Sequence, residues 1–203
     1  GSSHIMSVLS TGLAKTSAAA GGYTIDNSLR FNDDDSAYLN QTLGTATNRK
    51  KWTFSCWVKR GNTIATGGSQ MKLFAAGGTG ADTAIQFTGT DTIYFGLGDG
   101  AANVQTNALY RDPSAWYHIV GAVDTTIASP SGTNQRIKLY VNGTQITDLS
   151  SSTYPSLNAE YAINDATTHW IGRYWHSSGA WYDGHIAEVH FIDGQALDHT
   201  SFG

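Results

Sequence analysis

The chain has 203 residues, a length that suits one large β-sandwich or two small domains. Charged residues make up only 14% of it and the net charge is −4, so the sequence lacks the basic surface that a nucleic-acid partner requires. No apolar run approaches the roughly 20 residues of a membrane-spanning helix, so membrane insertion is not expected. With 23 Gly, 3 Pro and 11% aromatic residues, the composition favours strands joined by tight turns.

The first 22 residues are interpreted as lying outside the folded domain. Residues 1–6 are typical of an expression-tag remnant, and residues 7–22 are rich in Ala, Ser and Gly, as in a flexible lead-in. We expect a single domain over residues 23–203, cut from a longer polypeptide. Cys56 is the sole cysteine and lies in an apolar segment, which favours a buried role over a reactive thiol.

Short apolar segments separated by turn residues predict about a dozen strands and no long helix. In chain order, the expected strands cover residues 28–32, 37–40, 52–59, 71–76, 84–88, 92–97, 116–124, 136–141, 144–147, 169–173 and 185–192. No repeat of fixed period is visible, which disfavours a propeller or a solenoid. The sequence therefore predicts an all-β protein, a two-sheet antiparallel β-sandwich.

The clearest strand pattern runs from Trp116 to Thr147. Apolar side chains occupy both faces over residues 116–124, as expected in the middle of a packed sheet. Residues 136–141 then alternate between apolar and more polar types, the period of a half-buried strand. Asn142 and Gly143 follow at once, and this pair predicts a type I′ hairpin, because both positions of that turn need a positive φ.

Six short motifs occur in the order in which they occur in laminin-G-like domains. They are Leu29-Arg-Phe31 with Tyr38-Leu39, Phe54-Ser-Cys-Trp-Val-Lys59, Ala115-Trp-Tyr-His-Ile-Val120, Lys138-Leu-Tyr-Val-Asn-Gly143, Trp170-Ile-Gly-Arg173 and Asp183-Gly-His-Ile-Ala-Glu-Val189. From Leu29 to Leu197 the chain thus resembles the laminin-G-like, concanavalin A-like jelly-roll family. The resemblance implies a fold and no particular chemistry, because lectins, glycosidases and adhesion modules share it.

The glycosidases of this fold carry a strand motif of the form Glu-x-Asp-x-x-Glu, and this sequence does not contain it. Glu160 and Glu188 are the only glutamates, and Glu188 is followed by His190 and Asp193 at the two positions where the motif has acids. Retaining hydrolysis needs two carboxyl groups about 5 Å apart. We therefore expect a non-catalytic module, with a divergent glycan hydrolase as the enzymatic alternative.

A loop-like segment before the last strand offers the best candidate for a glycan or partner site. Aromatic rings can stack on the apolar face of a sugar while nearby polar groups bind its hydroxyls. The candidate residues of this segment are Tyr174, Trp175, His176, Trp181 and Asp183. The plainer interpretation is that Trp181 and its neighbour Tyr182 simply lead into the last core strand.

The resemblance also suggests calcium, because related jelly rolls often place a calcium ligand in the turn after the first strand. Asp33, Asp34 and Asp35 occupy that turn, and Glu188 on the last strand is the fourth candidate ligand. Clustered carboxylates suit a hard cation that takes six to eight oxygen ligands. Ala187 departs from the family pattern, in which an Asp is common at this place, and a solvated acidic turn is the alternative.

His185, Glu188 and His190 are a further candidate metal set. The two histidines are an odd number of positions apart, which places them on opposite faces of a regular strand. This spacing argues against a shared transition metal.

The amino-acid sequences of residues 111–120 and 191–197 are similar to those of modules in bacteriophage tail-fibre and other virion proteins. This similarity implies a module on the virion surface that recognises a carbohydrate or another host cell-surface receptor. Contacts with other virion subunits and assembly into a homotrimer are also expected. The main alternative from another class is a structural or decoration module that makes only protein–protein contacts.

Overall fold

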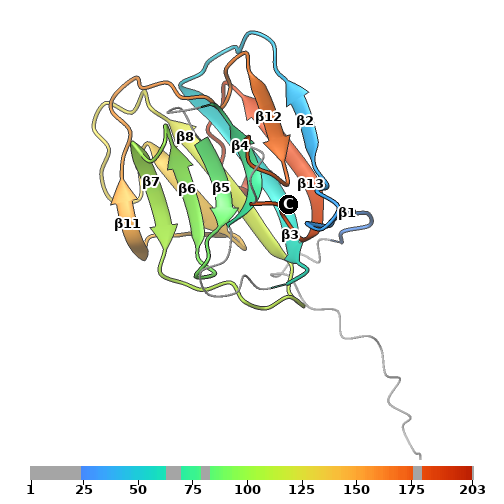
Figure 1. The fold of residues 1–203 in the computed structure, drawn as a ribbon. Helices are drawn as coiled ribbons and strands as arrows, with labels where there is room; N and C mark the ends of the chain where they lie inside the picture. Colours follow the sequence, from blue (N-terminus) through green and yellow to red (C-terminus); the bar gives the residue numbers. More distant parts are fainter. Residues whose placement is uncertain (1–23, 63–69, 79–82, 176–179, 203) are drawn as a thin grey trace, which may run out of the picture.

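The computed structural model describes residues 24–62, 70–78, 83–175 and 180–202. Within these ranges thirteen strands form two antiparallel sheets that pack face to face (Figure 1). The predicted all-β, two-sheet sandwich is thus confirmed. In the described part of the chain, no helix is long and apolar enough to cross a membrane. The expectations for residues 1–22 and for His176 fall outside the described residues.

The six-stranded sheet has the order β1-β13-β3-β8-β9-β10. Its strands are β1 (Leu29–Phe31), β13 (Gly184–Asp193), β3 (Lys51–Arg60), β8 (Tyr117–Asp124), β9 (Ile137–Val141) and β10 (Thr144–Gln145). The long strands β3 and β8 lie in its middle, and the short strands β1 and β10 form its edges. Strand β13 is close to the carboxyl end of the chain, yet it is inserted between β1 and β3.

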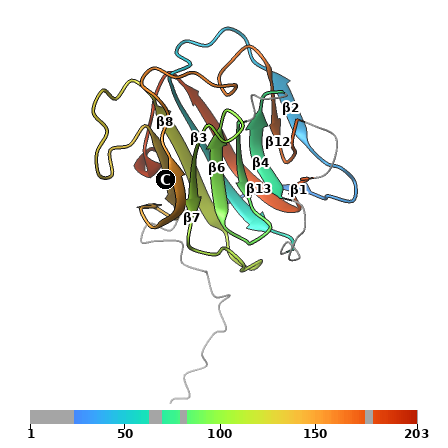
Figure 2. The same ribbon diagram turned by 60° about the vertical axis from the view of Figure 1, so that its left-hand side comes forward.

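The seven-stranded sheet has the order β11-β7-β6-β5-β4-β12-β2. Its strands are β11 (Leu149–Thr153), β7 (Ala102–Thr106), β6 (Ile93–Leu97), β5 (Thr83–Phe87), β4 (Met71–Ala76), β12 (Thr168–Ile171) and β2 (Leu39–Thr42). Strands β1 and β2 therefore lie at one lateral edge of the sandwich, and β10 and β11 lie at the other (Figures 1 and 2).

The core lies between the two sheets and is built from alternate residues of both. Phe54 of β3 stacks on Phe74 of β4, with ring centres 4.3 Å apart, and Trp52 meets Phe95 of β6 edge-on at 5.7 Å. Cys56, two positions after Phe54 on β3, is fully buried, and burial raises the pKa of its thiol. The predicted burial of this cysteine is confirmed.

The predicted hairpin is also confirmed. Asn142 and Gly143 have φ values of 49° and 75°, and Thr144 pairs with Val141 directly after the turn. The Asn142 side chain links the hairpin to the neighbouring strand β8, because its Oδ1 accepts a hydrogen bond from the His118 backbone N–H at 2.8 Å.

A β-bulge in β13 corrects the prediction that His185 and His190 face opposite sides. The register shifts at Glu188, which has a φ of 48°, so that Glu188 and Val189 of β13 lie opposite the single residue Cys56 of β3. His185 pairs with Lys59 and His190 with Ser55, which places both histidines on the same face. They lie four β3 positions apart, roughly 13 Å, too far to share one ion. Strand periodicity failed here because a bulge adds one residue.

Candidate functional site

A row of polar side chains crosses the outward face of the seven-stranded sheet. Alternate residues such as Ile85, Phe95 and Val104 enter the core, so their strand neighbours point outward. The register then aligns five outward residues across β4, β5, β6, β7 and β11: Lys72, Gln86, Tyr94, Gln105 and Ser151. We call these five residues the polar row. It crosses four strand spacings of about 4.8 Å, roughly 19 Å in all.

The Lys72 end of the polar row meets the loop that the sequence singled out. Lys72 is buried, and its Nζ donates hydrogen bonds to the amide oxygens of Gln86 and, at 3.0 Å, Gln70. The same ammonium lies 4.6 Å from the centre of the Tyr174 ring. The structure thus brings Tyr174 to the row, and Trp175 lies half-buried beside it, with ring centres 5.7 Å apart.

A second line of outward residues runs beside the polar row. Trp170 pairs with Ala75, which pairs with Ala84, and Ala84 pairs with Gly96. The Tyr94 ring lies over Gly96, since a Cβ at that glycine would be 2.3 Å from a ring carbon. Two aromatic side chains therefore flank a strip that carries no long side chain.

The outward face has little charge. At its paired outward positions in the described strands, Lys72 is the only ionisable group other than the Tyr94 phenol, and no Asp or Glu occurs. Burial, and secondly the nearby Asp99, raises the pKa of Tyr94, so this phenol is neutral and can both donate and accept a hydrogen bond. Gln86 is buried beside Lys72, so the accessible part of the polar row offers the Gln105 amide, the Ser151 hydroxyl and the Tyr94 ring. In the described strands the face lacks the carboxyl pair that glycoside hydrolysis uses.

Trp181 lies in a compact cluster at the β2 edge, together with Tyr38 and Arg173. The Arg173 guanidinium carbon is 4.6 Å from the Tyr38 ring centre and 4.7 Å from that of Trp181, and the two ring centres are 5.8 Å apart. Arg173 Nε donates to the Tyr174 carbonyl at 2.8 Å. We call Tyr38, Arg173 and Trp181 the edge cluster. Its cation covers part of both rings, so Trp181 is held in place and is not a free stacking platform.

Asp183 is buried and makes structural contacts. Its Oδ1 accepts a hydrogen bond from Arg30 Nη1 at 2.6 Å, and its backbone carbonyl accepts one from the Gly61 N–H at 2.9 Å. The adjacent Tyr182 is fully buried and donates to the Lys59 carbonyl at 2.9 Å. These two residues tie β1, β3 and β13 together, and the plainer interpretation of Tyr182 is confirmed.

The acidic turn after β1 uses its carboxylates within the turn. Asp35 Oδ2 accepts a hydrogen bond from Asn32 Nδ2 at 2.6 Å, and Asp33 Oδ1 accepts one from the Asp34 backbone N–H at 3.0 Å. Such contacts shape a solvated turn. They leave fewer oxygens to a cation than the sequence suggested.

Glu188 does not join this turn. The register pairs Phe31 with Gly184 and Leu29 with Ile186, so Glu188 lies beyond the amino end of β1, whereas the acidic turn follows its carboxyl end. Glu188 lies instead 3.9 Å from His190. Nowhere in the described ranges do three or more His, Cys, Asp or Glu side chains gather as metal ligands would. Asp33, Asp34, Asp35 and Glu188 thus do not fit one shared calcium site.

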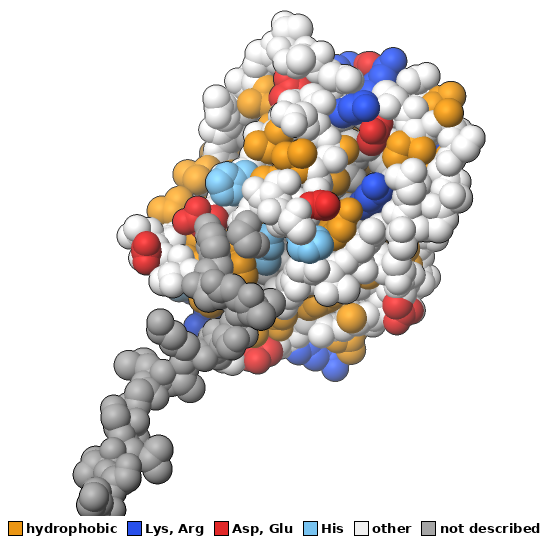
Figure 3. All heavy atoms as spheres, turned by 180° about the vertical axis from the view of Figure 1, so that it is seen from behind, with side chains coloured by type: hydrophobic (Ala, Val, Ile, Leu, Met, Phe, Trp, Pro, Cys, Tyr) orange, Lys and Arg blue, Asp and Glu red, His pale blue; other side chains and the backbone are white. Residues whose placement is uncertain are grey.

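The polar row was not predicted from the sequence. Its signal is present as alternation, for example Gln86 between Ile85 and Phe87, and Tyr94 between Ile93 and Phe95. The alignment of these residues across five strands depends on the register, which the sequence does not display. On the opposite side of the molecule, hydrophobic, acidic and basic side chains are interspersed (Figure 3).

The two antiparallel sheets and their strand order define a concanavalin A-like β-sandwich. Residues 31–200 match the family model described as the concanavalin A-like lectin/glucanases superfamily, and the chain belongs to this family. The resemblance found in the sequence is thereby confirmed. No protein with curated annotation matches the chain.

Several solved structures share the fold at low sequence identity. The LG4-5 domains of the mouse laminin α1 chain are 12% identical, with a TM-score of 0.55 over 86% of this chain and 44% of that one. The Ruminococcus gnavus IT-sialidase CBM40 bound to α2,3-sialyllactose is 14% identical, with a TM-score of 0.51 over 82% and 96%. The binding domain of botulinum neurotoxin DC in complex with SialylT is 13% identical, with a TM-score of 0.56 over 86% and 40%. The chain spans less than half of the laminin and neurotoxin chains.

Proposed function

We propose that this chain is a non-catalytic module that binds a glycan along the polar row. The observation that carries the proposal is the outward face of the seven-stranded sheet, where amide, hydroxyl and aromatic groups occur without a carboxylate at the described positions. Sugar hydroxyls both donate and accept hydrogen bonds, as Gln105, Ser151 and Tyr94 require. The C–H face of a sugar ring packs on aromatic rings such as Trp170 and Tyr94.

Two further observations support binding without catalysis. Hydrolysis of a glycosidic bond uses paired carboxyl groups, and this face offers none in its described strands. The structural neighbours include a carbohydrate-binding module with a bound sialyllactose and a toxin binding domain in complex with SialylT. Release of reducing ends from polysaccharides is the direct test, and we expect none. Measurable release would overturn the non-catalytic assignment.

The loop that follows β12 would extend this site. Tyr174 lies against Lys72 at one end of the polar row, and Trp175 lies beside Tyr174. His176, outside the described residues, stays a candidate of this loop, whereas Trp181 is packed against Arg173 and Asp183 is bonded to Arg30, so neither is part of the proposed binding surface. Replacement of Trp175 by Ala should weaken glycan binding. Unchanged binding would remove the loop from the site and leave the row.

A glycan array followed by calorimetry with the best glycan tests the row itself. We expect Trp170→Ala to weaken binding at least about tenfold, since loss of an aromatic platform removes both contact area and stacking. Trp116→Ala is the matched control, because Trp116 is half-buried and lies against His185 on the six-stranded sheet. Equal losses in both variants, or no binding to any glycan, would refute the proposal.

We further propose that the module is part of a virion or tail-fibre protein, exposed on the particle surface, where it meets a host-surface glycan or receptor. The support is the sequence similarity of residues 111–120 and 191–197 to modules of virion proteins. The sequence of the parent polypeptide tests it. Neighbouring fibre or baseplate domains would support this location, and neighbouring secreted-enzyme domains would contradict it.

A structural module is the second candidate, and one observation favours it. The β1–β2 edge exposes three large apolar side chains, namely Leu29, Tyr38 and Leu39, which are 56%, 42% and 47% exposed. Exposed apolar side chains at a sheet edge suit contacts with another subunit. Light scattering after gel filtration tests this. A trimer that Leu29→Ser with Leu39→Ser converts to monomer would support the subunit contact, and a monomeric native chain would count against it.

A further inference from the structure

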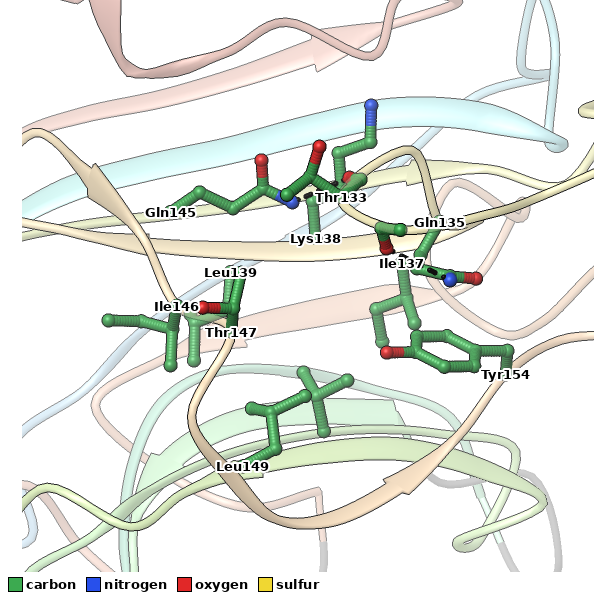
Figure 4. A pocket seen from close by; sticks show the side chains of 12 residues that line it. Thr133, Gln135, Ile137, Lys138, Leu139, Gln145, Ile146, Thr147, Leu149 and Tyr154 are labelled. Carbon is green, nitrogen blue, oxygen red and sulfur yellow. Dashed lines mark hydrogen bonds between the residues drawn. The ribbon is translucent and has the colours of Figure 1, made fainter.

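The outward face of the six-stranded sheet is buried near its centre. On β9, Ile137 and Leu139 point toward the seven-stranded sheet, and Lys138 points away from it (Figure 4). Strand pairing carries this alternation across β8 and β3. Five further outward residues are each at most 6% exposed, namely Thr53, Ser55, His118, Val120 and Tyr140. A part of the chain other than the seven-stranded sheet therefore covers them.

Residues 195–202, which we call the strap, lie across this face. The chain turns at Gly194, which has a φ of 81° and whose N–H donates to the Lys51 carbonyl at 3.0 Å. The Thr53 hydroxyl then holds the first half of the strap. It donates to the Gln195 carbonyl at 2.8 Å and accepts a hydrogen bond from the Leu197 N–H at 2.8 Å. These contacts fix the strap to β3.

The second half of the strap is held by rings. It contains the short 3-10 helix η2 (His199–Ser201). The His199 ring centre lies 5.3 Å from that of Tyr140 on β9, and the Phe202 ring centre lies 5.7 Å from that of His190 on β13. Among the described contacts, no hydrogen bond or ion pair joins residues 198–202 to the sheet. This half is therefore the part of the strap that is most easily detached.

His118 of β8 lies under the strap. Its Nε2 is 2.9 Å from Ser55 Oγ, and its ring stacks on Trp57 with ring centres 4.8 Å apart. Burial, and then the charges of His199 and His190, lower the pKa of this imidazole. Three imidazoles, from β8, β13 and the strap, thus lie near one another around a buried position. Histidine is the side chain that gains charge on mild acidification, so acid places like charges here.

Few acidic groups are placed to compensate that charge. Asp198 bonds within the strap, where its Oδ1 accepts hydrogen bonds from the N–H and the hydroxyl of Thr200. Glu188 lies 3.9 Å from His190, on the exposed side of β13. No carboxylate in the described part of the chain bonds with His118 or His199. The other ionisable groups on the outward sides of the packed strands are Lys51 and Lys59 of β3, Asp124 of β8, Lys138 and Tyr140 of β9 and His185 of β13.

We propose that the strap is an acid-released cover of this sheet. Protonation of His118, beside His190 and His199, detaches the strap and uncovers the outward face around Ser55 and Val120. A buried cation without a paired carboxylate is costly, and opening of the strap returns it to water. The inference is independent of the proposed glycan site, because the polar row lies on the other sheet.

Exchange of the Leu197 amide proton with solvent, measured by nuclear magnetic resonance, tests the proposal. This proton is released when the strap leaves Thr53. An imidazole pKa that rises from about 4 under the strap to about 6.5 in water makes opening roughly fiftyfold more favourable at pH 4.5 than at pH 7. After correction for the intrinsic exchange rate, we expect the protection of Leu197 to fall by about this factor, while amides of β3 and β8 keep theirs. Unchanged protection of Leu197, or equal losses in β3 and β8, would overturn the proposal.

Variants identify the group that responds to acid. His118→Phe keeps a ring on Trp57 and cannot gain a proton, so the acid effect on Leu197 should disappear. His199→Phe keeps a ring on Tyr140 and removes one of the repelling charges, so the effect should decrease, and this variant serves if His118→Phe does not fold. His185→Phe is the matched control, because His185 lies on the same face but against Trp116, with ring centres 6.4 Å apart. An acid effect that survives both His118→Phe and His199→Phe, or that His185→Phe abolishes equally, would refute the proposal.

Discussion

At the scale of single residues, Arg60 is the most demanding side chain, because it is a fully buried cation in an apolar core. Its Nη1 donates to Asp91 Oδ1 at 2.8 Å and to the Tyr110 carbonyl at 2.6 Å, and its guanidinium lies over the Phe87 ring. Its Nε and Nη2 are buried without a hydrogen-bond partner. Among the described residues Asp91 is the one carboxylate paired with Arg60, and its Oδ2 also accepts a hydrogen bond from Arg111 Nε at 3.0 Å.

Removal of Asp91 should be far more costly than removal of Arg111. Asp91→Ala leaves the Arg60 charge buried and unpaired, so we expect a loss of about 3–5 kcal/mol in the free energy of unfolding. Arg111→Ala should cost less than about 1 kcal/mol, because the Arg111 side chain is 61% exposed. Urea denaturation of both variants measures the difference. Similar losses would show that Asp91 does not compensate Arg60.

His118 should make stability depend on pH. Burial, followed by repulsion from His199 and His190, lowers the pKa of this imidazole to about 4, and its Nε2 lies 2.9 Å from Ser55 Oγ. The unfolded chain takes up a proton near the usual value of about 6.5, whereas the folded chain does so only near 4. Lower pH in this window therefore favours unfolding. Burial also lowers the pKa of His169, which acts in the same direction.

We thus expect the free energy of unfolding to fall between pH 6.5 and pH 4, and His118→Gln to reduce the slope. Asp124 and Asp193 do not obscure this window. Burial raises the pKa of each carboxyl group, but hydrogen bonds, with Thr126 and with Asn164 respectively, outweigh burial and lower both pKa values. The stability that these carboxylates contribute is therefore lost at pH values below this window. Urea denaturation at several pH values provides the measurement. A slope unchanged in His118→Gln would contradict the assignment.

At the scale of elements, Gly121 sets how closely β8 approaches the facing sheet. A Cβ at this position would lie 2.7 Å from Ile85 Cδ1 and 2.9 Å from a Phe95 ring carbon. Gly121→Ala should therefore overpack the core and cost about 1–3 kcal/mol. Gly44→Ala is the control, since no atom lies within 4 Å of its added Cβ, and we expect a change within about 0.5 kcal/mol. Thermal denaturation compares them, and a neutral Gly121→Ala would show that the sheets can separate.

Most strands could be predicted from the sequence. Two strands, β7 and β11, could not, and each failure has a physical reason. Strand β11, Leu-Ser-Ser-Ser-Thr, is an exposed edge strand with no apolar alternation, and β7 sends only Ala102, Val104 and Thr106 inward. The loop residues Tyr174 and Trp175 were predicted from composition. The polar row was not, because it depends on pairing between strands that are distant in sequence.

At the scale of the whole molecule, calcium should not change the thermal midpoint. A ligand that binds only the native state raises the midpoint. The candidate ligands are divided between the acidic turn, where Asp35 bonds with Asn32, and Glu188 at the far end of β1. We therefore expect equal midpoints in calcium and in chelator. A higher midpoint in calcium that Asp33→Asn abolishes would restore the turn as a calcium site.

The position of β13 has a consequence for how the chain acquires its structure during synthesis. Ser28 and His185, 157 positions apart, share a hydrogen bond, and β13 fills the gap between β1 and β3. A nascent chain that has not reached residue 193 cannot complete its six-stranded sheet, so the unpaired edge of β3 stays exposed on the ribosome. Contacts of such long sequence separation also make folding slow. Synthesis of β13, and not of the first half of the domain, is therefore the step after which this sandwich can close.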